Sequence, residues 1–138
     1  MKKILFVLFL LIVCGISSFA QKAPYNVVFD LTSADTVVHK MVLRWINEIK
    51  HADPNAKIEV VLYAKSLDLV TADKSTYTDS ITKYAKMNNV AFKVCEVAMK
   101  NNQVNKSQLL PGVQTVPDGI YEIISKQHEG WGYIKAAK

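Results

Sequence analysis

The stretch VAFKVCEVAMK, from Val90 to Lys100, joins two kinds of local pattern at a single cysteine. Its first half, up to Val94, is an apolar run rich in residues that favour strands, whereas the residues from Glu96 onward are typical of a helix. Cys95 stands at the junction. A strand that leads directly into a helix is the building unit of α/β proteins, so this stretch indicates the fold class.

The same alternation of strand and helix patterns continues on both sides of this stretch. The first helix is the clearest, because apolar residues recur in pairs every four residues from Val37 to Ile49. In the last helix we expect Pro117 in the first turn and Ile120, Ile123 and Ile124 on the core face. Strands are expected at 25–31, 57–64, 90–94, 113–116 and 131–134, and helices at 34–50, 75–87, 96–101 and 117–130.

This order of elements predicts a mainly parallel five-stranded sheet with helices on both faces, because strands that alternate with helices form parallel, doubly wound sheets. At this chain length we expect a flavodoxin-like α/β domain with the strand order 2-1-3-4-5.

The N-terminus has the features of a secretory signal peptide. Two lysines precede an apolar run from Ile4 to Ile16, and small residues follow at Ser18 and Ala20. We expect cleavage after Ala20, which makes residues 1–20 a signal peptide and residues 21–138 one α/β domain. The mature protein is then periplasmic or secreted.

Two other interpretations of the N-terminus stay open. A retained membrane anchor is one, although the apolar run is shorter than the roughly 20 residues that a membrane span needs. Lipoprotein processing at Cys14 is the other, on the basis of a loose lipobox at residues 11–14.

Composition and motifs exclude several function classes. The net charge is +5, but lysines and acids alternate along the chain without a basic block, so no nucleic-acid surface is expected. Residues 32–35, after the first strand, lack the glycines of a dinucleotide fingerprint, so NAD and ATP are not expected. The three histidines, His39, His51 and His128, have no metal-ligand spacing and are expected on the surface. We therefore expect no cofactor and no metal.

Cys95 is the one cysteine left when the signal peptide is removed. An odd cysteine in an exported protein indicates a reactive thiol or an intermolecular disulfide, but a small buried side chain is also common. In parallel sheets, ligand sites lie beyond the carboxyl ends of the strands at the topological switch point, which the expected strand order places between strands 1 and 3. Cys95 would lie there at a helix N-terminus, which favours a thiolate. The other residues expected to line this crevice are Thr32, Ser33, Asp68, Glu96, Met99 and Pro117.

Several short blocks then match a known pattern in order and spacing. They are Val94-Cys95-Glu96 with Met99-Lys100, Leu109-Leu110-Pro111-Gly112-Val113, Val116-Pro117-Asp118-Gly119-Ile120 with Glu122-Ile123-Ile124, and Lys126-Gln127 with Glu129-Gly130-Trp131 and Tyr133-Ile134-Lys135. The chain resembles the DsrE/DsrF-like sulfur-relay family, in particular its exported, single-domain members. Such members often have Cys-x-Asn-Thr-Met where this chain has Cys95-Glu96-Val97-Ala98-Met99.

The resemblance implies a flavodoxin-like fold, trimeric or hexameric assembly, and a cysteine after the third strand that accepts sulfane sulfur as a persulfide. Cys95 stands where that cysteine would. The resulting hypothesis is an exported homo-oligomer that binds or relays sulfane sulfur through Cys95, as a carrier or transferase rather than a turnover enzyme, with donor or acceptor proteins as partners. The alternative is a non-catalytic ligand-binding or structural oligomer in which Cys95 is buried and inert.

Overall fold

A computed structural model describes residues 23–137 of the chain, so the expected signal peptide and its cleavage site lie outside the described residues. Within this part, strands and helices alternate as the sequence predicts, and most boundaries lie within three residues of the expected ones. In chain order the elements are β1 (Asn26–Leu31), α2 (Thr36–Ala52), β2 (Lys57–Leu62), η1 (Ser66–Val70), α3 (Thr78–Ala85), β3 (Val90–Cys95), α4 (Glu96–Asn101), η2 (Lys106–Gln108), β4 (Gln114–Val116), α5 (Gly119–His128) and β5 (Gly132–Ala136).

The five strands form one parallel sheet, which confirms the predicted α/β class. The expected strand order 2-1-3-4-5 is wrong: the observed order is β4-β3-β2-β1-β5, with β2 in the centre between β1 and β3. Local periodicity determines the succession of elements, but it does not determine the sheet edge toward which each crossover turns. The chain adds β2, β3 and β4 on one side of β1 and then returns to place β5 on the other side.

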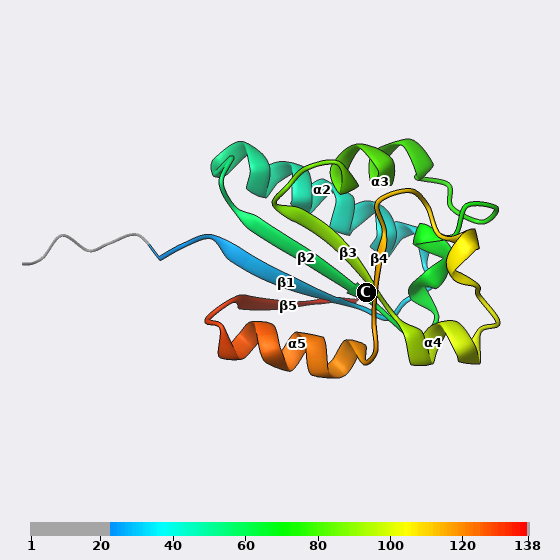
Figure 1. Cartoon of the computed structure of the whole chain (residues 1–138). Helices are drawn as coiled ribbons and strands as arrows, with labels where there is room; N and C mark the ends of the chain where they lie inside the picture. The colour runs from blue at the N-terminus through cyan, green and yellow to red at the C-terminus, as the bar shows by residue number, and fades with distance from the viewer. Residues whose placement is uncertain (1–22, 138) are drawn as a thin grey trace, which may run out of the picture.

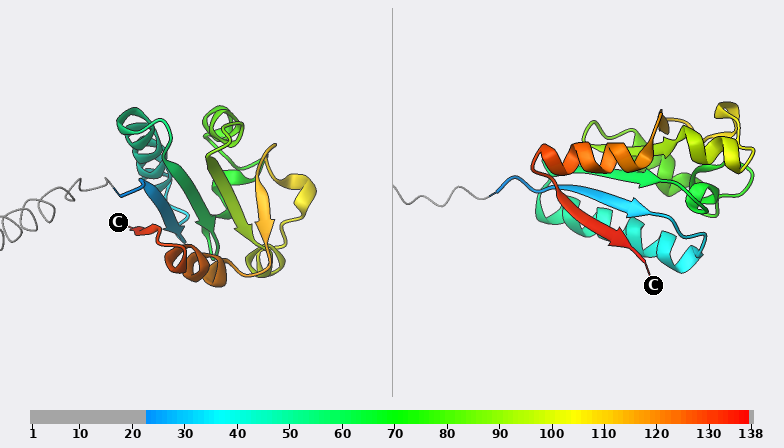
Figure 2. Two further views of the ribbon diagram at one scale, coloured as in Figure 1. Left: turned by 60° about the vertical axis from the view of Figure 1, so that its left-hand side comes forward. Right: turned by 90° about the horizontal axis from the view of Figure 1, so that it is seen from below.

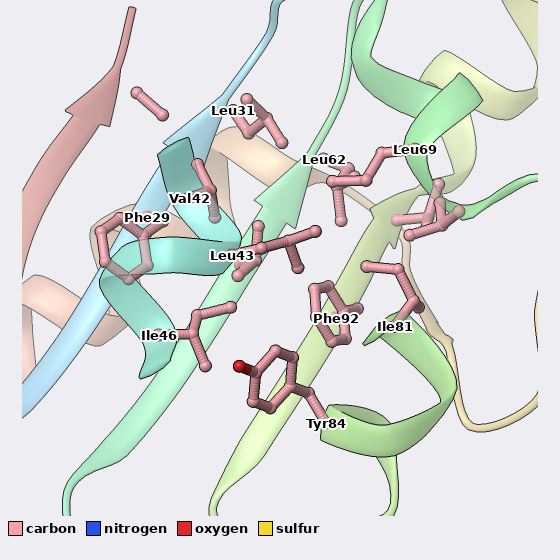
Figure 3. Packing of buried hydrophobic residues seen from close by; sticks show 14 of the residues in the cluster. Phe29, Leu31, Val42, Leu43, Ile46, Leu62, Leu69, Ile81, Tyr84 and Phe92 are labelled. Atoms are coloured by element: carbon pink, nitrogen blue, oxygen red, sulfur yellow. The ribbon is translucent and has the colours of Figure 1, made fainter. Parts of the chain in front are cut away.

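Helices cover both faces of the sheet, as Figures 1 and 2 show from different sides. Helices α2 and α3 lie on one face, and α5 lies on the other. The main core fills the space between the sheet and the α2/α3 layer, where Phe29, Ile46, Leu62 and Phe92 are fully buried (Figure 3). The predicted stripe of α2 supplies much of this core, except that Val37 in its first turn is 59% exposed.

The last helix packs differently from the expectation. Asp118 is its N-cap, so Pro117 lies before the helix rather than in its first turn. Ile123 is buried, but Ile120 and Ile124 are 57% and 45% exposed, which corrects their assignment to the core face. The sheet face beneath α5 has only a small apolar cluster, and a narrow apolar strip on the helix is enough to cover it.

His39 also differs from the expectation of a surface residue, because its side chain is buried within α2. Its Nε2 atom lies 2.8 Å from the carbonyl oxygen of Ser33, and this hydrogen bond satisfies the ring in the core. His51 and His128 are exposed, as predicted.

Candidate functional site

A pocket of about 450 Å³ opens at the carboxyl ends of the central strands. Its walls come from the segment after β2, the end of β3, helix α4 and the start of α5. The lining is mostly apolar with a polar rim. The lining residues are Tyr63, Ala64, Lys65, Cys95, Val97, Ala98, Asn101, Asn102, Asp118 and Ile120.

The position of the pocket follows from the winding of the chain. Strands β1, β2 and β3 are connected through α2 and α3 on one face, whereas β4 is connected to β5 through α5 on the other face (Figure 1). The winding therefore reverses at the carboxyl ends of β3 and β4, the kind of point at which open α/β sheets bind ligands.

Cys95 forms part of the pocket wall at this point. It is the last residue of β3, it directly precedes α4, and it pairs in register with Val116 of β4. Its side chain is 7% exposed. A Cβ atom placed on Gly119, the first residue of α5, would lie 3.1 Å from the Cβ and 3.7 Å from the Sγ of Cys95. The thiol therefore lies against the first turn of α5, and the glycine leaves the space that it occupies.

The first turn of α5 sets the local electrostatics. The N-terminus of a helix has a partial positive charge that favours anions. Asp118 offsets part of this charge, because its Oδ1 atom accepts hydrogen bonds from the backbone N–H groups of Ile120 (2.8 Å) and Tyr121 (3.3 Å).

Asn102 fixes the opposite wall of the pocket. Its Nδ2 atom donates to the carbonyl oxygens of Ala64 and Ala98, both at 2.8 Å, and so ties the segment after β2 to α4. Ala64 has a φ of +55°, in the left-handed region that a residue with a side chain seldom adopts. The two hydrogen bonds hold this strained backbone in place.

Ionisable side chains occupy the sheet face beneath α5. Glu59 of β2 is buried, and its Oε1 atom has no hydrogen-bond partner within residues 23–137. Burial, followed by the hydrogen bond and the charge of Glu122, raises the pKa of Glu59 to about 7, although Lys93 and Lys126 act in the opposite direction. Glu122 also lies 4.0 Å from Lys93. Glu59 therefore keeps its proton to a higher pH than an exposed glutamate does.

Thr32 and Ser33, which follow the first strand and were expected beside Cys95, do not lie in its pocket. The carbonyl oxygen of Thr32 accepts a hydrogen bond from the backbone of Lys65, and Ser33 caps the following segment by accepting from Asp35. Neither is among the residues that line the Cys95 pocket. The expected crevice between strands 1 and 3 does not form, because β2 lies between these strands.

The other four residues expected at the site do not line the pocket either. Asp68 of η1 forms a half-exposed ion pair with Lys74. Glu96 is exposed and accepts a 2.8 Å hydrogen bond from Thr115 on β4. Met99 is buried in the main core, and Pro117 immediately precedes the α5 cap.

Three residues that line the pocket were not predicted from the sequence as site residues: Tyr63, Asn102 and Asp118. Asp118 had a readable signal, because an Asp directly before an apolar helical pattern is a typical N-cap. Tyr63 and Asn102 had no comparable signal, since their roles depend on contacts between segments far apart in the chain.

Residues 23–137 contain no group of three or more His, Cys, Asp or Glu side chains that could hold a metal ion. In this range there is also no helix with the length and apolar character that crossing a membrane requires.

The fold and the site define the class of protein: a single parallel α/β domain with a cysteine in a pocket at the reversal of the winding. The family model described as "DsrE/DsrF-like family" matches residues 26–136, and the chain belongs to this family.

Several solved structures share the fold of this chain. The protein of unknown function MTH1491 from Methanobacterium thermoautotrophicum is similar with a TM-score of 0.75 and 26% identity, over 80% of this chain and 98% of that one. The ychN protein from E. coli has a TM-score of 0.68 and 11% identity, over 81% and 98% of the two chains. BT1422 from Bacteroides thetaiotaomicron, a conserved protein of unknown function, has a TM-score of 0.65 and 17% identity, over 80% and 94%. No curated protein matches the chain.

Proposed function

We propose that this protein carries sulfane sulfur on Cys95 as an exported, homo-oligomeric member of its family. The observation that supports this most directly is the placement of Cys95, the one free cysteine within residues 23–137, in the wall of the pocket against the first turn of α5. A thiolate is the nucleophile in sulfur transfer, and the partial positive charge of a helix N-terminus favours a thiolate.

The reaction requires no cofactor. The Cys95 thiolate attacks the outer sulfur of a donor persulfide, R–S–SH. A new S–S bond forms to Cys95, the donor S–S bond breaks, and the donor leaves as the thiolate R–S⁻. Cys95 then holds a persulfide, Cys–S–SH, and an acceptor thiolate takes up its outer sulfur by the same exchange. This is the chemistry of a carrier or transferase with partner proteins that supply and remove sulfur.

Mass spectrometry after incubation with polysulfide tests this function. We expect the native protein to gain the mass of sulfur at Cys95 and to release thiocyanate on treatment with cyanide. Cys95→Ser serves as the matched control and should show neither result. An unmodified Cys95 in folded protein after this treatment contradicts the proposal.

The low exposure of Cys95, 7%, supports a second candidate function. In this case the pocket binds a small ligand or mediates a subunit contact, and the thiol is inert. Labelling with iodoacetamide distinguishes the two functions. A carrier should react in the native state with a rate that rises with pH, whereas an inert thiol should react only after denaturation.

The proposed export and assembly depend on other parts of the chain. Export depends on residues 1–20, and N-terminal sequencing of the protein from the cell envelope should give Gln21 as the first residue. An N-terminus at Cys14, or an uncleaved chain in the membrane, contradicts cleavage after Ala20.

Assembly is supported by apolar side chains on the surface. Ile120 and Tyr121 on α5 are exposed, and so are Tyr133 and Ile134 on the edge strand β5. Light scattering should give the mass of a trimer or hexamer, and the mass of a single chain contradicts this part of the proposal.

A further inference from the structure

The pocket beside Cys95 has room for more than the transferred sulfur atom. Its volume is about 450 Å³, and pockets that bind small organic ligands have volumes of roughly 300–1,000 Å³. One sulfur atom on Cys95 fills only a small part of this space. The rest of the pocket is therefore available to the body of the molecule that brings the sulfur.

One wall of the pocket is apolar and comes from two helices. Val97 and Ala98 on α4 and Ile120 on α5 line the pocket together with Cys95. Ala98 is buried, whereas Val97 and Ile120 are 56% and 57% exposed. Large apolar side chains that are open to solvent at the mouth of a pocket are stabilised when a ligand covers them. This wall therefore fits the carbon body of an organic molecule.

Lys65, in the segment after β2, brings a positive charge to the same pocket. Its side chain forms no ion pair within residues 23–137. The acidic side chain among the lining residues, Asp118, is already engaged at the positive end of α5, where it accepts hydrogen bonds from the N–H groups of Ile120 and Tyr121. Lys65 is therefore the charged group that stays available to bind an anion.

We propose that the sulfur donor for this pocket is a low-molecular-weight organic persulfide with a carboxylate group, and that Lys65 selects it by binding the carboxylate. The inference rests on the proposed function, in which Cys95 carries sulfur. It deepens that function, because a small molecule rather than a second protein supplies the sulfur.

The exchange takes place within the pocket. The Cys95 thiolate attacks the outer sulfur of the bound donor, R–S–SH, and a new S–S bond forms to Cys95. The donor S–S bond breaks, the outer sulfur keeps its proton, and the small thiolate R–S⁻ leaves the pocket. Lys65 determines specificity and takes no part in the exchange of bonds.

The test measures how fast Cys95 is loaded from two donors that differ in one group. N-acetylcysteine persulfide has a carboxylate, and the persulfide of N-acetylcysteine amide has nearly the same size without the charge. Mass spectrometry follows the loading of Cys95, and each rate is divided by the rate of the same donor with free cysteine, which removes differences in intrinsic reactivity. We expect the loading rate to saturate as the donor concentration rises, because the donor binds before it reacts.

The carboxylate donor should load the native protein faster than the amide donor. At low donor concentration we expect a preference of about 1.5- to 5-fold, which corresponds to the 0.2–1 kcal/mol of an exposed ion pair. Lys65→Gln should lose this preference and load from both donors as the native protein loads from the amide. Salt at about 1 M should also remove most of the preference, because it shortens the screening length to about 3 Å. Lys100→Gln is the matched control, since Lys100 is an exposed residue of α4 that does not line the pocket, and it should keep the preference.

A second pair of variants tests the apolar wall. Ile120→Ser removes part of the wall and should raise the half-saturating concentration of both donors by about 2- to 5-fold, the effect of losing part of one apolar contact. Ile124→Ser is its matched control, because Ile124 is a 45% exposed residue of the same helix that does not line the pocket. This control should match the native protein with both donors.

Two results overturn the inference while the proposed function stands. A loading rate that stays proportional to donor concentration shows that the pocket does not bind the donor. An equal loss of rate with both donors in Lys65→Gln shows that Lys65 acts on the Cys95 thiolate and not on the carboxylate.

Failure of the proposed function is seen separately, as an unmodified Cys95 after incubation with polysulfide. The unreactive analogue N-acetyl-S-methylcysteine then tests the pocket without sulfur transfer. It should shift the NMR signals of Ala98 and Ile120 in the native protein and shift them less in Lys65→Gln. Equal shifts in the two proteins, or no shift in either, contradict the selection of a small carboxylate by Lys65.

Discussion

The buried glutamate beneath α5 should make the stability of this protein decrease as the pH rises toward 8. The pKa of Glu59 is about 7 in the fold against 4.5 ordinarily, so the folded chain keeps a proton that the unfolded chain loses. The stabilisation from neutral Glu59 is therefore fully present below pH 4.5 and is lost as the pH rises through 7. Glu59→Gln removes this dependence, because the amide stays neutral and can donate to Glu122.

The size of the effect follows from the pKa values. One pKa unit corresponds to about 1.4 kcal/mol, so a rise from 4.5 to about 7 gives an upper value of about 3.5 kcal/mol. Water can screen part of this effect at Glu122 and Lys93, whose side chains are 20% and 22% exposed. We therefore compare the free energy of unfolding of Glu59→Gln with that of the native protein at each pH. The variant minus native difference should increase by about 2 kcal/mol from pH 5 to pH 8.

Urea unfolding at closely spaced pH values measures this difference. Glu48→Gln is the matched control, because its carboxylate lies on the surface of α2 in an exposed pair with Arg44. The free energy of unfolding of this control should follow that of the native protein at each pH. A difference between Glu59→Gln and the native protein that stays constant from pH 5 to pH 8 would refute the reasoning.

Three further substitutions test the pocket walls. Asn102→Ala removes the hydrogen bonds to Ala64 and Ala98 and should lower the free energy of unfolding by about 1–2 kcal/mol. An unchanged urea midpoint contradicts the structural role of these hydrogen bonds. Asn101→Ala is the control, because Asn101 is exposed. Ala64→Gly relieves the backbone strain of a φ of +55° and should raise the free energy of unfolding by about 0.5–1 kcal/mol, and with it the melting temperature. A lower melting temperature would contradict backbone strain at Ala64. Gly119→Ala places a methyl group 3.1 Å from the Cβ of Cys95 and should destabilise the fold by about 1–3 kcal/mol and alter thiol labelling. Gly130→Ala is the control for the steric effect of the added methyl group, because no atom lies within 4 Å of a Cβ placed on Gly130. The φ of +83° at Gly130 adds backbone strain to this control.

The elements of this fold were predictable because their signals are local. The stripe of α2 and the apolar runs of β1, β2 and β3 each depend on residues a few positions apart. The strand order was not predictable in this way, because it depends on which edge of the sheet each crossover reaches. This single error moved the expected crevice and led to Thr32 and Ser33, while Cys95 kept its place because the end of β3 borders the pocket in the observed order.

The polar face beneath α5 did have a sequence signal. Residues on the two faces of a strand alternate, and Asp30, Glu59 and Lys93 each interrupt an otherwise apolar strand at a position that points to the same face. A polar layer on one side of the sheet could therefore have been inferred from the alternation. Its consequence could also have been inferred, namely that the helix on that side needs little apolar surface and leaves Ile120 and Ile124 exposed.

The short block Val116-Pro117-Asp118-Gly119-Ile120, which contributed to the family resemblance, now has a physical explanation. Val116 ends β4 beside Cys95, and the chain must then turn sharply to cross the opposite face of the sheet. Pro117 cannot extend the ladder of backbone hydrogen bonds, and Asp118 caps the helix that begins next. Gly119 follows because any larger residue would crowd the thiol. The residues that reverse the winding therefore also make room for the cysteine, and this links the strand order of the fold to its candidate chemistry.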